Sequence, residues 1–379
     1  MTYLFFLLLT AAWFYQFLAL VCLGRFFRPL ASSAPPVATG PGITVFKPLK
    51  GLSPLSRECL TSFLTQDYHS YQVLFGVRDP DDPVLALLRE LARAHPRCEL
   101  SVVICPEDLG LNPKISTLRQ LMPRARYDLL VIADGDVLVG PDYLAQVAAA
   151  FRQPGVGLVS CPYRAGPSRT LGSALEALTI AADFIPSVAV AHYVESVRFA
   201  LGATMALTRQ ALTAIGGLAP LADFLADDYQ LGFRVAQTGL QVKILPYVVE
   251  TCNPEMSCRD YLSHQLRWAR TYRICRPAGY LAYGITHALV YSLAILLGAG
   301  LAPWAWGLVA ATLVLRGALA GFSERRGLKG SLPLWAFALL PAKDLLAFGL
   351  WLASFLGSRV NWGGRSFRVT PEGKLAPSK

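Results

Sequence analysis

The chain has 379 residues, of which 54% are hydrophobic and only 16% are charged. Its mean hydropathy of +0.41 is high for a water-soluble globular protein, so membrane segments are expected. The net charge of +10 does not indicate a nucleic-acid partner, because the arginines cluster beside apolar stretches and the sequence has no nucleic-acid-binding motif. Contact with the anionic headgroups of a lipid bilayer explains this charge better.

The first apolar stretch predicts a membrane anchor over residues 1–28. Residues 3–24 carry no charge and are as long as a bilayer-spanning helix needs. A cleaved signal peptide is the alternative, but no positive residue precedes the stretch, and Arg25 and Arg28 follow it. We therefore expect an uncleaved anchor, with these arginines and the region after them in the cytoplasm.

Between residues 40 and 255, short apolar runs alternate with helix-like stretches. The runs are ITVF, QVLFGV, ELSVVIC, DLLVIA and VGLVSC. The helix-like stretches lie near residues 54–65, 83–95, 112–122 and 141–151. This alternation predicts an α/β domain with a mostly parallel sheet, covered by helices on both faces. The eight cysteines form no CxxC pair, so we expect reduced thiols.

A membrane region is expected over residues 280–358, followed by a cytoplasmic tail at 359–379. Residues 280–300 and 303–322 predict two spans. Positive residues precede the first stretch, follow the second and follow the third stretch, 333–356. Because positive flanks favour the cytoplasmic side, we expect all three of these flanks in the cytoplasm. The third apolar stretch, 333–356, must therefore enter and leave the membrane on the same side.

This third stretch is predicted to form a re-entrant or interfacial hairpin. Pro341 can break its helix, and Lys343 and Asp344 would stay near the lipid headgroups. A single straight span is the alternative, and it would place the tail outside the cytoplasm.

The stretch LLVIADGDVLVG, residues 129–140, has two interpretations. Asp134-Gly135 between apolar runs is typical of a tight β-hairpin. If DLLVIA is a buried parallel strand, Asp134 and Asp136 instead follow its carboxyl end, where open α/β sheets bind ligands. The two interpretations are compatible, because a tight turn at Gly135 can direct both carboxylates into one cleft.

Charged residues also follow other predicted elements. Asp79 comes directly after the second strand and is the better ligand candidate there, whereas Asp81 and Asp82 are typical of a solvated turn. Lys114 lies in a loop that leads into a helix, where its point charge can meet a phosphate. A lone lysine at such a position is usually a surface residue.

Two further motifs lie nearer the C-terminal membrane region. Asp227 and Asp228 begin an amphipathic helix, where acidic residues also simply complement the helix dipole. Arg267 and Trp268 lie in a basic, aromatic segment, 256–279, which by itself predicts an interfacial amphipathic helix.

The motifs together resemble a known pattern. FKPLKG, VRDPDDP, LNPK, ADGD, LADDY, HQLRW and VNWGGRSFRV follow the order and approximate spacing of the ceramide glucosyltransferase family, glycosyltransferase family 21. They most closely resemble its bacterial branch, the hopanoid-biosynthesis-associated glycosyltransferases. The resemblance covers nearly the whole chain and implies a GT-A domain, a nucleotide-diphospho-sugar transferase fold, with membrane helices at both ends.

The resemblance implies a donor site for a UDP-sugar. Asp79 corresponds to the uridine contact, and Asp134 lies near the ribose and phosphates. Asp136, with Asp134 beside it, corresponds to the ligand of Mg²⁺ or Mn²⁺, a hard cation that stabilises the departing diphosphate. Lys114 in LNPK belongs to the same group of cofactor-binding candidates.

The resemblance also implies the catalytic residues. Asp228 corresponds to the base that activates the acceptor, and Asp227 beside it would raise the pKa of one of the pair. Arg267-Trp268 corresponds to the final motif, in which Arg267 can clamp phosphates. His264 occupies the position of a Gln or Arg in that motif, and its role stays open because a histidine can be neutral there.

The implied activity is transfer of one sugar from a UDP-sugar to a hydroxyl group of a membrane lipid, with inversion of the anomeric carbon. The bacterial branch implies UDP-N-acetylglucosamine and a hopanoid such as bacteriohopanetetrol, at the bacterial inner membrane. The wider family implies UDP-glucose and ceramide. The apolar stretch 171–207 could wall a groove for the lipid, although buried core explains it equally well.

Two other functions fit the sequence less well. A processive polysaccharide synthase shares the aspartates and the Arg-Trp motif, but its channel needs more spans than the sequence predicts. A non-enzymatic membrane protein does not explain carboxylates at four strand or helix ends of one α/β domain.

Overall fold

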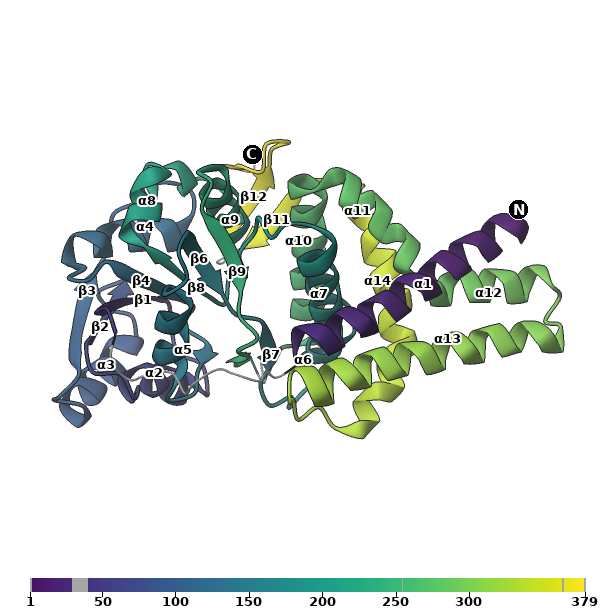
Figure 1. The fold of residues 1–379 in the computed structure, drawn as a ribbon, viewed down its shortest axis with the longest axis horizontal. Helices are drawn as coiled ribbons and strands as arrows, with labels where there is room; N and C mark the ends of the chain where they lie inside the picture. Colours follow the sequence, from purple (N-terminus) through teal and green to yellow (C-terminus); the bar gives the residue numbers. More distant parts are fainter. Residues whose placement is uncertain (1, 29–39, 254, 363–364, 378–379) are drawn as a thin grey trace.

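The computed structural model describes the chain except for residues 1, 29–39, 254, 363–364 and 378–379. The two glycines of the VNWGGRSFRV motif therefore lie outside the described residues. An α/β domain occupies one half of the molecule, and a group of long helices extends from its side (Figure 1). All eight cysteines are free thiols, as expected.

A seven-stranded sheet forms the centre of the α/β domain. Its strands, in spatial order, are β3 (Glu99–Ile104), β2 (Tyr71–Val77), β1 (Ile43–Leu49), β4 (Leu129–Ala133), β8 (Thr204–Thr208), β6 (Val156–Ser160) and β9 (Gln241–Ile244). The first four are parallel, β6 and β9 are parallel to each other, and β8 runs antiparallel to both its neighbours. The predicted mostly parallel sheet is confirmed.

Helices cover both faces of this sheet. One face carries α2 (Ser56–Leu64), α3 (Val84–Ala94) and α5 (Tyr143–Ala150). The other carries α4 (Pro113–Leu121), η1 (Met122–Arg124), α8 (Arg209–Ala214), η3 (Ala219–Leu221) and α9 (Asp227–Gln237).

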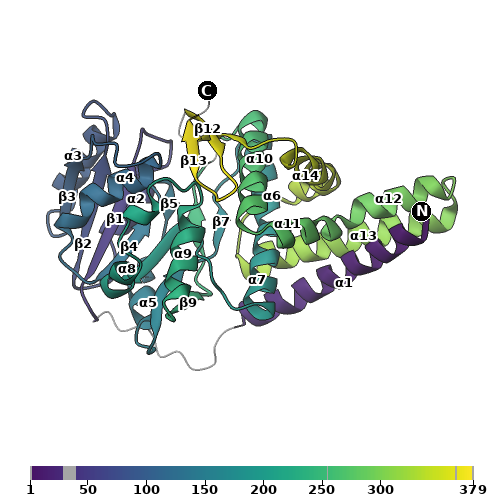
Figure 2. The same cartoon turned by 90° about the horizontal axis from the view of Figure 1, so that it is seen from above.

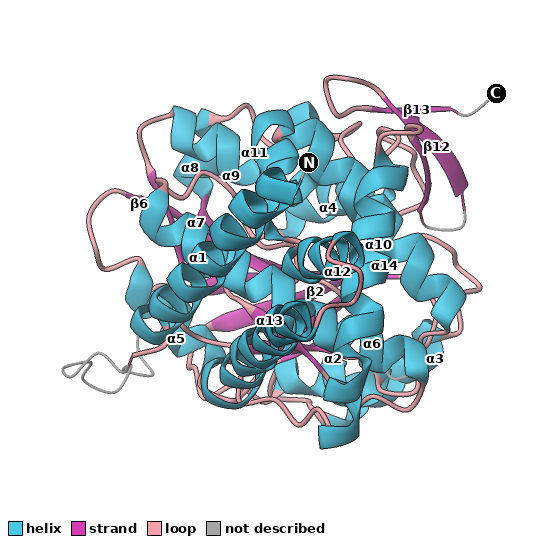
Figure 3. Ribbon diagram, turned by 90° about the vertical axis from the view of Figure 1, so that its right-hand side faces the viewer, coloured by secondary structure: helices cyan, strands magenta, loops and turns pink. Residues whose placement is uncertain are grey.

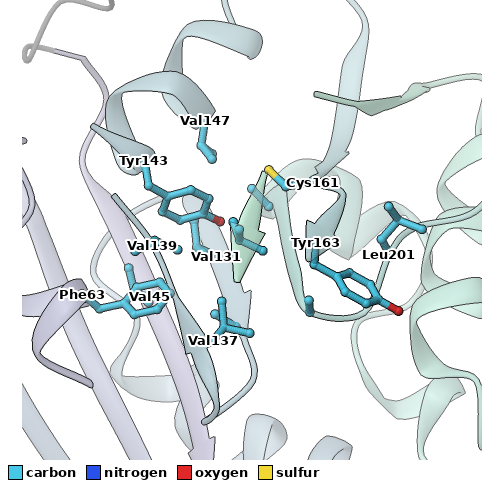
Figure 4. Packing of buried hydrophobic residues seen from close by; sticks show 14 of the residues in the cluster. Val45, Phe63, Val131, Val137, Val139, Tyr143, Val147, Cys161, Tyr163 and Leu201 are labelled. Carbon is cyan, nitrogen blue, oxygen red and sulfur yellow. The ribbon is translucent and has the colours of Figure 1, made fainter. Parts of the chain in front are cut away.

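Successive strand residues point to opposite faces, so β1 supplies Val45 to one apolar cluster and Phe46 to the other. Figure 4 shows Val45 and Val131 packed with Phe63 and Tyr143 on the first face. Both faces of the central strands are therefore buried, which is why their sequences are almost continuously apolar.

The Asp134–Asp136 stretch forms a turn but not the predicted hairpin. The N–H of Val137 donates to the carbonyl of Asp134 at 3.3 Å. The short strand that follows, β5 (Val137–Leu138), pairs with β10 (Val249–Thr251), which also pairs with β7 (Tyr163–Ala165). A return pairing with β4 is excluded, because β1 and β8 already occupy both edges of that strand.

Three helices extend together from the α/β domain: α1 (Thr2–Phe26), α12 (Ala288–Gly298) and α13 (Pro303–Phe322), which continues into η5 (Ser323–Gly327). Seen from their free end, they lie side by side (Figure 3). α1 and α13 with η5 are each long and apolar enough to cross a membrane. The predicted span 280–300 is not straight: Pro277–Thr286, comprising α11 (Pro277–Tyr283) and η4 (Gly284–Thr286), meets α12 at an angle of 50°.

The apolar stretch after residue 170 forms one continuous helix, from α6 (Leu171–Thr179) through η2 (Ile180–Phe184) to α7 (Ile185–Val194). It is also long and apolar enough to span a membrane, but 72% of its most apolar window is buried inside the protein. This burial favours the core interpretation for most of the stretch, whereas Tyr193 and Val194 at its end are exposed.

The third C-terminal stretch is helical without a break, so the predicted hairpin is wrong. η6 (Leu334–Leu339) continues directly into α14 (Leu340–Ser354). Pro341 lies in the first turn of α14, where its missing N–H leaves no helical hydrogen bond unmade. Figure 2 shows α14 along its axis and α1 and α13 lengthwise, so α14 runs across the projecting helices.

The tail packs on the α/β domain. Its small sheet consists of β11 (Arg359–Trp362), β12 (Arg365–Val369) and β13 (Leu375–Pro377). The N–H of Leu375 donates to the carbonyl of Asp223 at 2.6 Å, and the N–H of Leu225 donates to that of Gly373. The tail and the α/β domain must therefore lie on the same side of any membrane. Leu334–Ser354, which comprises η6 and α14, is itself long and apolar enough to cross one.

Four buried charged side chains join the helices of this region. Arg316 on α13 makes two hydrogen bonds to Asp344 on α14, at 2.7 and 2.8 Å, and one to Asp183 on η2, at 2.7 Å. Lys343 pairs with the same two carboxylates. Lys343 and Asp344 are therefore buried inside the protein. The two positive and two negative charges balance, which makes their burial tolerable.

This balance generates a prediction. Arg316→Ala leaves a buried carboxylate without its partner and should lower stability by about 3–5 kcal/mol. The double variant Arg316→Ala/Asp344→Ala leaves the neutral Lys343–Asp183 pair, so its loss should be smaller than the sum of the single losses. Thermal unfolding in detergent measures both. Arg326→Ala, which removes an exposed arginine after the same helix, is the control, and an equal loss from Arg316→Ala and Arg326→Ala would contradict the prediction.

Candidate active site

Three parallel strands end at one edge of the sheet and bring the predicted donor-site residues to that edge. β2, β1 and β4 are neighbours, and Asp79 follows β2 while Asp134 follows β4. Asp79 is exposed, and its carboxylate accepts from the N–H of Asp81 at 2.9 Å. Asp82 accepts from the N–H groups of Gly51 and Val84, so it has the turn role that the sequence predicted.

Lys114 bridges the two acidic motifs. Its Nζ lies 2.7 Å from Asp134 Oδ1 and 3.6 Å from Asp227 Oδ2. Asn112, the N-cap of α4, accepts from the N–H of Ile115 and donates to the carbonyl of Phe224, which fixes the start of α4 against the segment before α9. Lys114 is therefore a buried electrostatic link, and not the isolated surface lysine that was the alternative.

Lys47 in FKPLKG is a second cation beneath the Asp134 turn. Its side chain is fully buried, its Nζ donates to the carbonyl oxygen of Asp134 at 2.6 Å, and it lies 4.0 Å from the centre of the Phe63 ring. Burial lowers the pKa of Lys47 to about 8, although the Asp136 and Asp134 charges oppose this shift. Lys47 thus holds the backbone of the turn that presents both aspartates.

Asp228 lies beside Asp227 at the start of α9. Its Oδ1 accepts from the N–H of Tyr229 at 2.7 Å. Gly202 approaches so closely that a Cβ at this position would lie 2.7 Å from Asp228 Oδ2, so only glycine fits there. Burial, followed by repulsion from the Asp227 charge, raises the pKa of Asp228 to about 6. A carboxylate with this pKa is suited to accept a proton near neutral pH.

The helix α10 (Cys258–Cys275) brings the last predicted motif to the same place. Burial lowers the pKa of Arg267, while the charges of Glu176 and Asp228 oppose the shift. His264 Nδ1 lies 3.1 Å from Glu176 Oε1, and Gln265 donates to Glu176 Oε2 at 2.8 Å. Glu176 on α6 is therefore the anionic centre around which this face of α10 is arranged.

Trp268 packs within this region of the protein. Its ring centre lies 4.7 Å from that of His264 and 5.4 Å from that of Phe184 on η2. This aromatic packing fixes the turn of α10 that carries Arg267. In the structure, Trp268 is thus a packing residue for its neighbours.

Asp136 is the residue best placed for a cation. It is exposed, whereas Asp134 is already paired with Lys114. Removal of water by the surrounding protein, together with repulsion from Asp134, raises the pKa of Asp136, and a divalent cation would relieve this repulsion. Among the described residues there is no group of three or more His, Cys, Asp or Glu side chains arranged to hold a metal. The residues therefore fit an ion held by one or two carboxylates together with the oxygen atoms of a bound diphosphate.

Sequence reasoning missed three residues of this site. Lys47 and Glu176 are single charges within otherwise apolar stretches, and that pattern is a usable signal for a buried, paired charge. Gly202 gave no such signal, since its importance depends on the approach of α9 from a distant part of the chain.

The comparisons with known proteins agree with this geometry. The sequence matches the profile of glycosyl transferase family 21 over residues 4–375. The chain belongs to this family. The family assignment made from the sequence motifs is confirmed.

Curated relatives include two proteins of Caenorhabditis elegans. Ceramide glucosyltransferase 1 is 24% identical over 237 residues, covering 62% of this chain and 50% of the relative. Ceramide glucosyltransferase 3 is 21% identical over 365 residues, covering 89% of this chain and 75% of the relative. The chain thus matches about half of the first relative's length and three quarters of the second's.

A solved structure shows the same fold. The mannosyltransferase PcManGT from Pyrobaculum calidifontis, in complex with GDP-Man and Mn²⁺, is 23% identical, with a TM-score of 0.55. The match covers 93% of the present chain and 99% of the mannosyltransferase chain. The predicted GT-A fold with apolar helices at both ends is confirmed.

The raised pKa of Asp228 predicts the acid limb of the activity profile. Sugar transfer that needs the ionised carboxylate should be lost as the pH falls through about 6. Asp227→Asn removes the repelling charge, so the pKa of Asp228 falls and the acid limb should move to lower pH. The measurement is kcat/KM against pH. Asp128→Asn, at the opposite end of β4, is the matched control, and an acid limb that does not move in Asp227→Asn would contradict the prediction.

Proposed function

We propose that this protein is a membrane-bound, inverting glycosyltransferase that moves one sugar from a UDP-sugar to a hydroxyl group of a membrane lipid. The observation that carries the proposal is the convergence of two acidic motifs on Lys114, with Arg267 near Asp228. This site adjoins apolar helices, so a lipid acceptor held in a bilayer has a short path to it.

On the donor side, Asp79 binds the uridine and Asp134 faces the ribose and phosphates. Asp136, with Asp134 beside it, would hold a divalent cation, Mg²⁺ or Mn²⁺, which would supply positive charge to stabilise the diphosphate leaving group. Arg267 adds hydrogen bonds to the same phosphates. Lys114 offsets the charge of Asp134, so that Asp134 repels the phosphates less. Lys47 holds the Asp134–Asp136 turn in place through the carbonyl of Asp134.

On the acceptor side, Asp228 is the general base. The acceptor oxygen attacks the anomeric carbon from the face opposite UDP, and its proton passes to the Asp228 carboxylate. The bond from the anomeric carbon to the diphosphate oxygen breaks, and UDP leaves with the electron pair. One displacement inverts the anomeric carbon, so an α-linked UDP-sugar gives a β-glycoside.

Two substrate pairs are candidates. The motifs that resemble the bacterial branch support UDP-N-acetylglucosamine and a hopanoid such as bacteriohopanetetrol. The similarity to ceramide glucosyltransferases of Caenorhabditis elegans supports UDP-glucose and ceramide. An assay with both donors and both acceptors separates the pairs.

The proposed location is the bacterial inner membrane, with the α/β domain and the tail in the cytoplasm. Arg25 and Arg28 after α1, and Arg325 and Arg326 after α13, support this orientation because positive residues favour the cytoplasmic side. Membership of a glycosyltransferase family argues against a non-enzymatic membrane protein.

The direct test is Asp228→Asn, which keeps the shape of the side chain but cannot accept the proton. Transfer of labelled sugar to lipid should fall by about 10²–10⁴-fold, while binding of UDP should be unchanged, because Asp228 is assigned to the acceptor side. Asp128→Asn is again the matched control. Full activity of Asp228→Asn would refute the base assignment, and unchanged transfer by the wild-type protein in excess chelator would remove the metal from the proposal.

A further inference from the structure

A cavity of about 240 Å³ lies between the α/β domain and the end of α10. Three segments line it: residues 195–199, which follow α7, Tyr229 and Phe233 on α9, and Arg276 at the end of α10. About 10–15 Å³ of such space is enough to hold one water, so the cavity has room for several waters or a short polar chain.

The cavity shares its walls with the proposed catalytic base. Tyr229 directly follows Asp228, and its N–H donates to the Asp228 carboxylate. Residues 195–199 continue to Gly202, which lies against that same carboxylate. The α9 wall of the cavity is thus one residue from Asp228, and on the chain that follows α7 Phe199 lies three residues before Gly202.

The cavity also begins where the apolar helix α7 ends. α7 packs along α1, and the His192 ring near its end lies 5.2 Å from that of Phe26. The next residues, Tyr193 and Val194, are 45% and 62% exposed. Glu195, the following residue, is the first cavity residue. An exposed apolar surface is thus followed, within a few residues, by a polar cavity. A lipid has the same order of parts, an apolar chain followed by a polar headgroup.

The walls combine aromatic faces with hydrogen-bonding groups of both signs. The rings of Tyr229 and Phe233 are nearly parallel, at 8°, with centres 6.0 Å apart. The Tyr229 hydroxyl donates to the carbonyl of Cys275 at 3.2 Å. Glu195 pairs with Arg276 across the cavity, and Arg198 donates to the Ser196 hydroxyl at 3.3 Å.

We propose that this cavity binds the hydroxyl-rich headgroup of the acceptor lipid and presents one hydroxyl to Asp228. Hydroxyl groups can donate to Glu195 and accept from Arg198, while the C–H face of a polyol packs on the two rings. Arg198 and Arg276 outnumber Glu195 in the lining, so a phosphate headgroup is the alternative occupant that the vesicle experiment below distinguishes. The inference rests on the proposed function for the identity of the acceptor, but not for the existence of the binding site.

The test uses two variants of the full chain in detergent. Ser196→Trp fills the cavity, and Arg198→Ala removes a donor; Gln237→Trp, exposed on the same helix α9 but outside the cavity, is the matched control. We expect the KM for the lipid acceptor, and the Kd of bacteriohopanetetrol measured without donor, to rise about tenfold or more in both cavity variants. The KM for the UDP-sugar and the Kd of UDP should stay at wild-type values.

Three other results would change the conclusion. Unchanged acceptor KM and unchanged Kd would overturn the inference. Loss of binding to phosphatidylglycerol vesicles with no change in the Kd of bacteriohopanetetrol would replace it with a membrane-docking surface. Absence of turnover by the wild-type protein would refute the proposed function alone, because weaker lipid binding by the cavity variants would still support the site.

Discussion

The attraction of one buried lysine for two acidic motifs is the interaction on which the site depends. Asp134 at the end of β4 and Asp227 at the start of α9 are far apart in the sequence, and Lys114 lies between their carboxylates. Without this charge, the acidic side chains of the two motifs would repel one another. Lys114 therefore allows the Asp134–Asp136 turn and the start of α9 to lie close together.

The helices beside the α/β domain position the other half of the site. Glu176 and Asp183 belong to the same continuous helix, α6 to η2. Glu176 faces His264 and Gln265 on α10, whereas Asp183 is paired with Arg316 on α13 and Lys343 on α14. The buried charges among the apolar helices thus fix the helix that orients α10 and, through it, Arg267.

Much of the fold could be predicted from the sequence, because the central strands are buried on both faces and their apolar runs are unbroken. The same reasoning failed where pairing partners are distant. β5 turned away from β4 because β8, more than 60 residues later, occupies the free edge of β4. Pro341 did not break its helix, because it lies in the first turn of α14, where a proline is tolerated. The sequence does not show where η6 ends and α14 begins.

The site was predictable in part for the same reason. Asp134, Asp136, Asp228 and Arg267 lie at the ends or on the polar faces of regular elements, and their order matches a family pattern. Lys47, Glu176 and Gly202 act through contacts with segments that the sequence does not place beside them. Such partners are visible only once the chain is folded.

The anomeric configuration of the product reports whether the acceptor displaces UDP in a single step. The protein is incubated with an α-linked UDP-sugar and a hydroxyl-bearing membrane lipid, and the first glycolipid formed is examined by NMR. Direct displacement, with Asp228 taking the acceptor proton, predicts a β-glycoside. An α-glycoside would contradict it, because a single displacement at the anomeric carbon cannot retain the configuration.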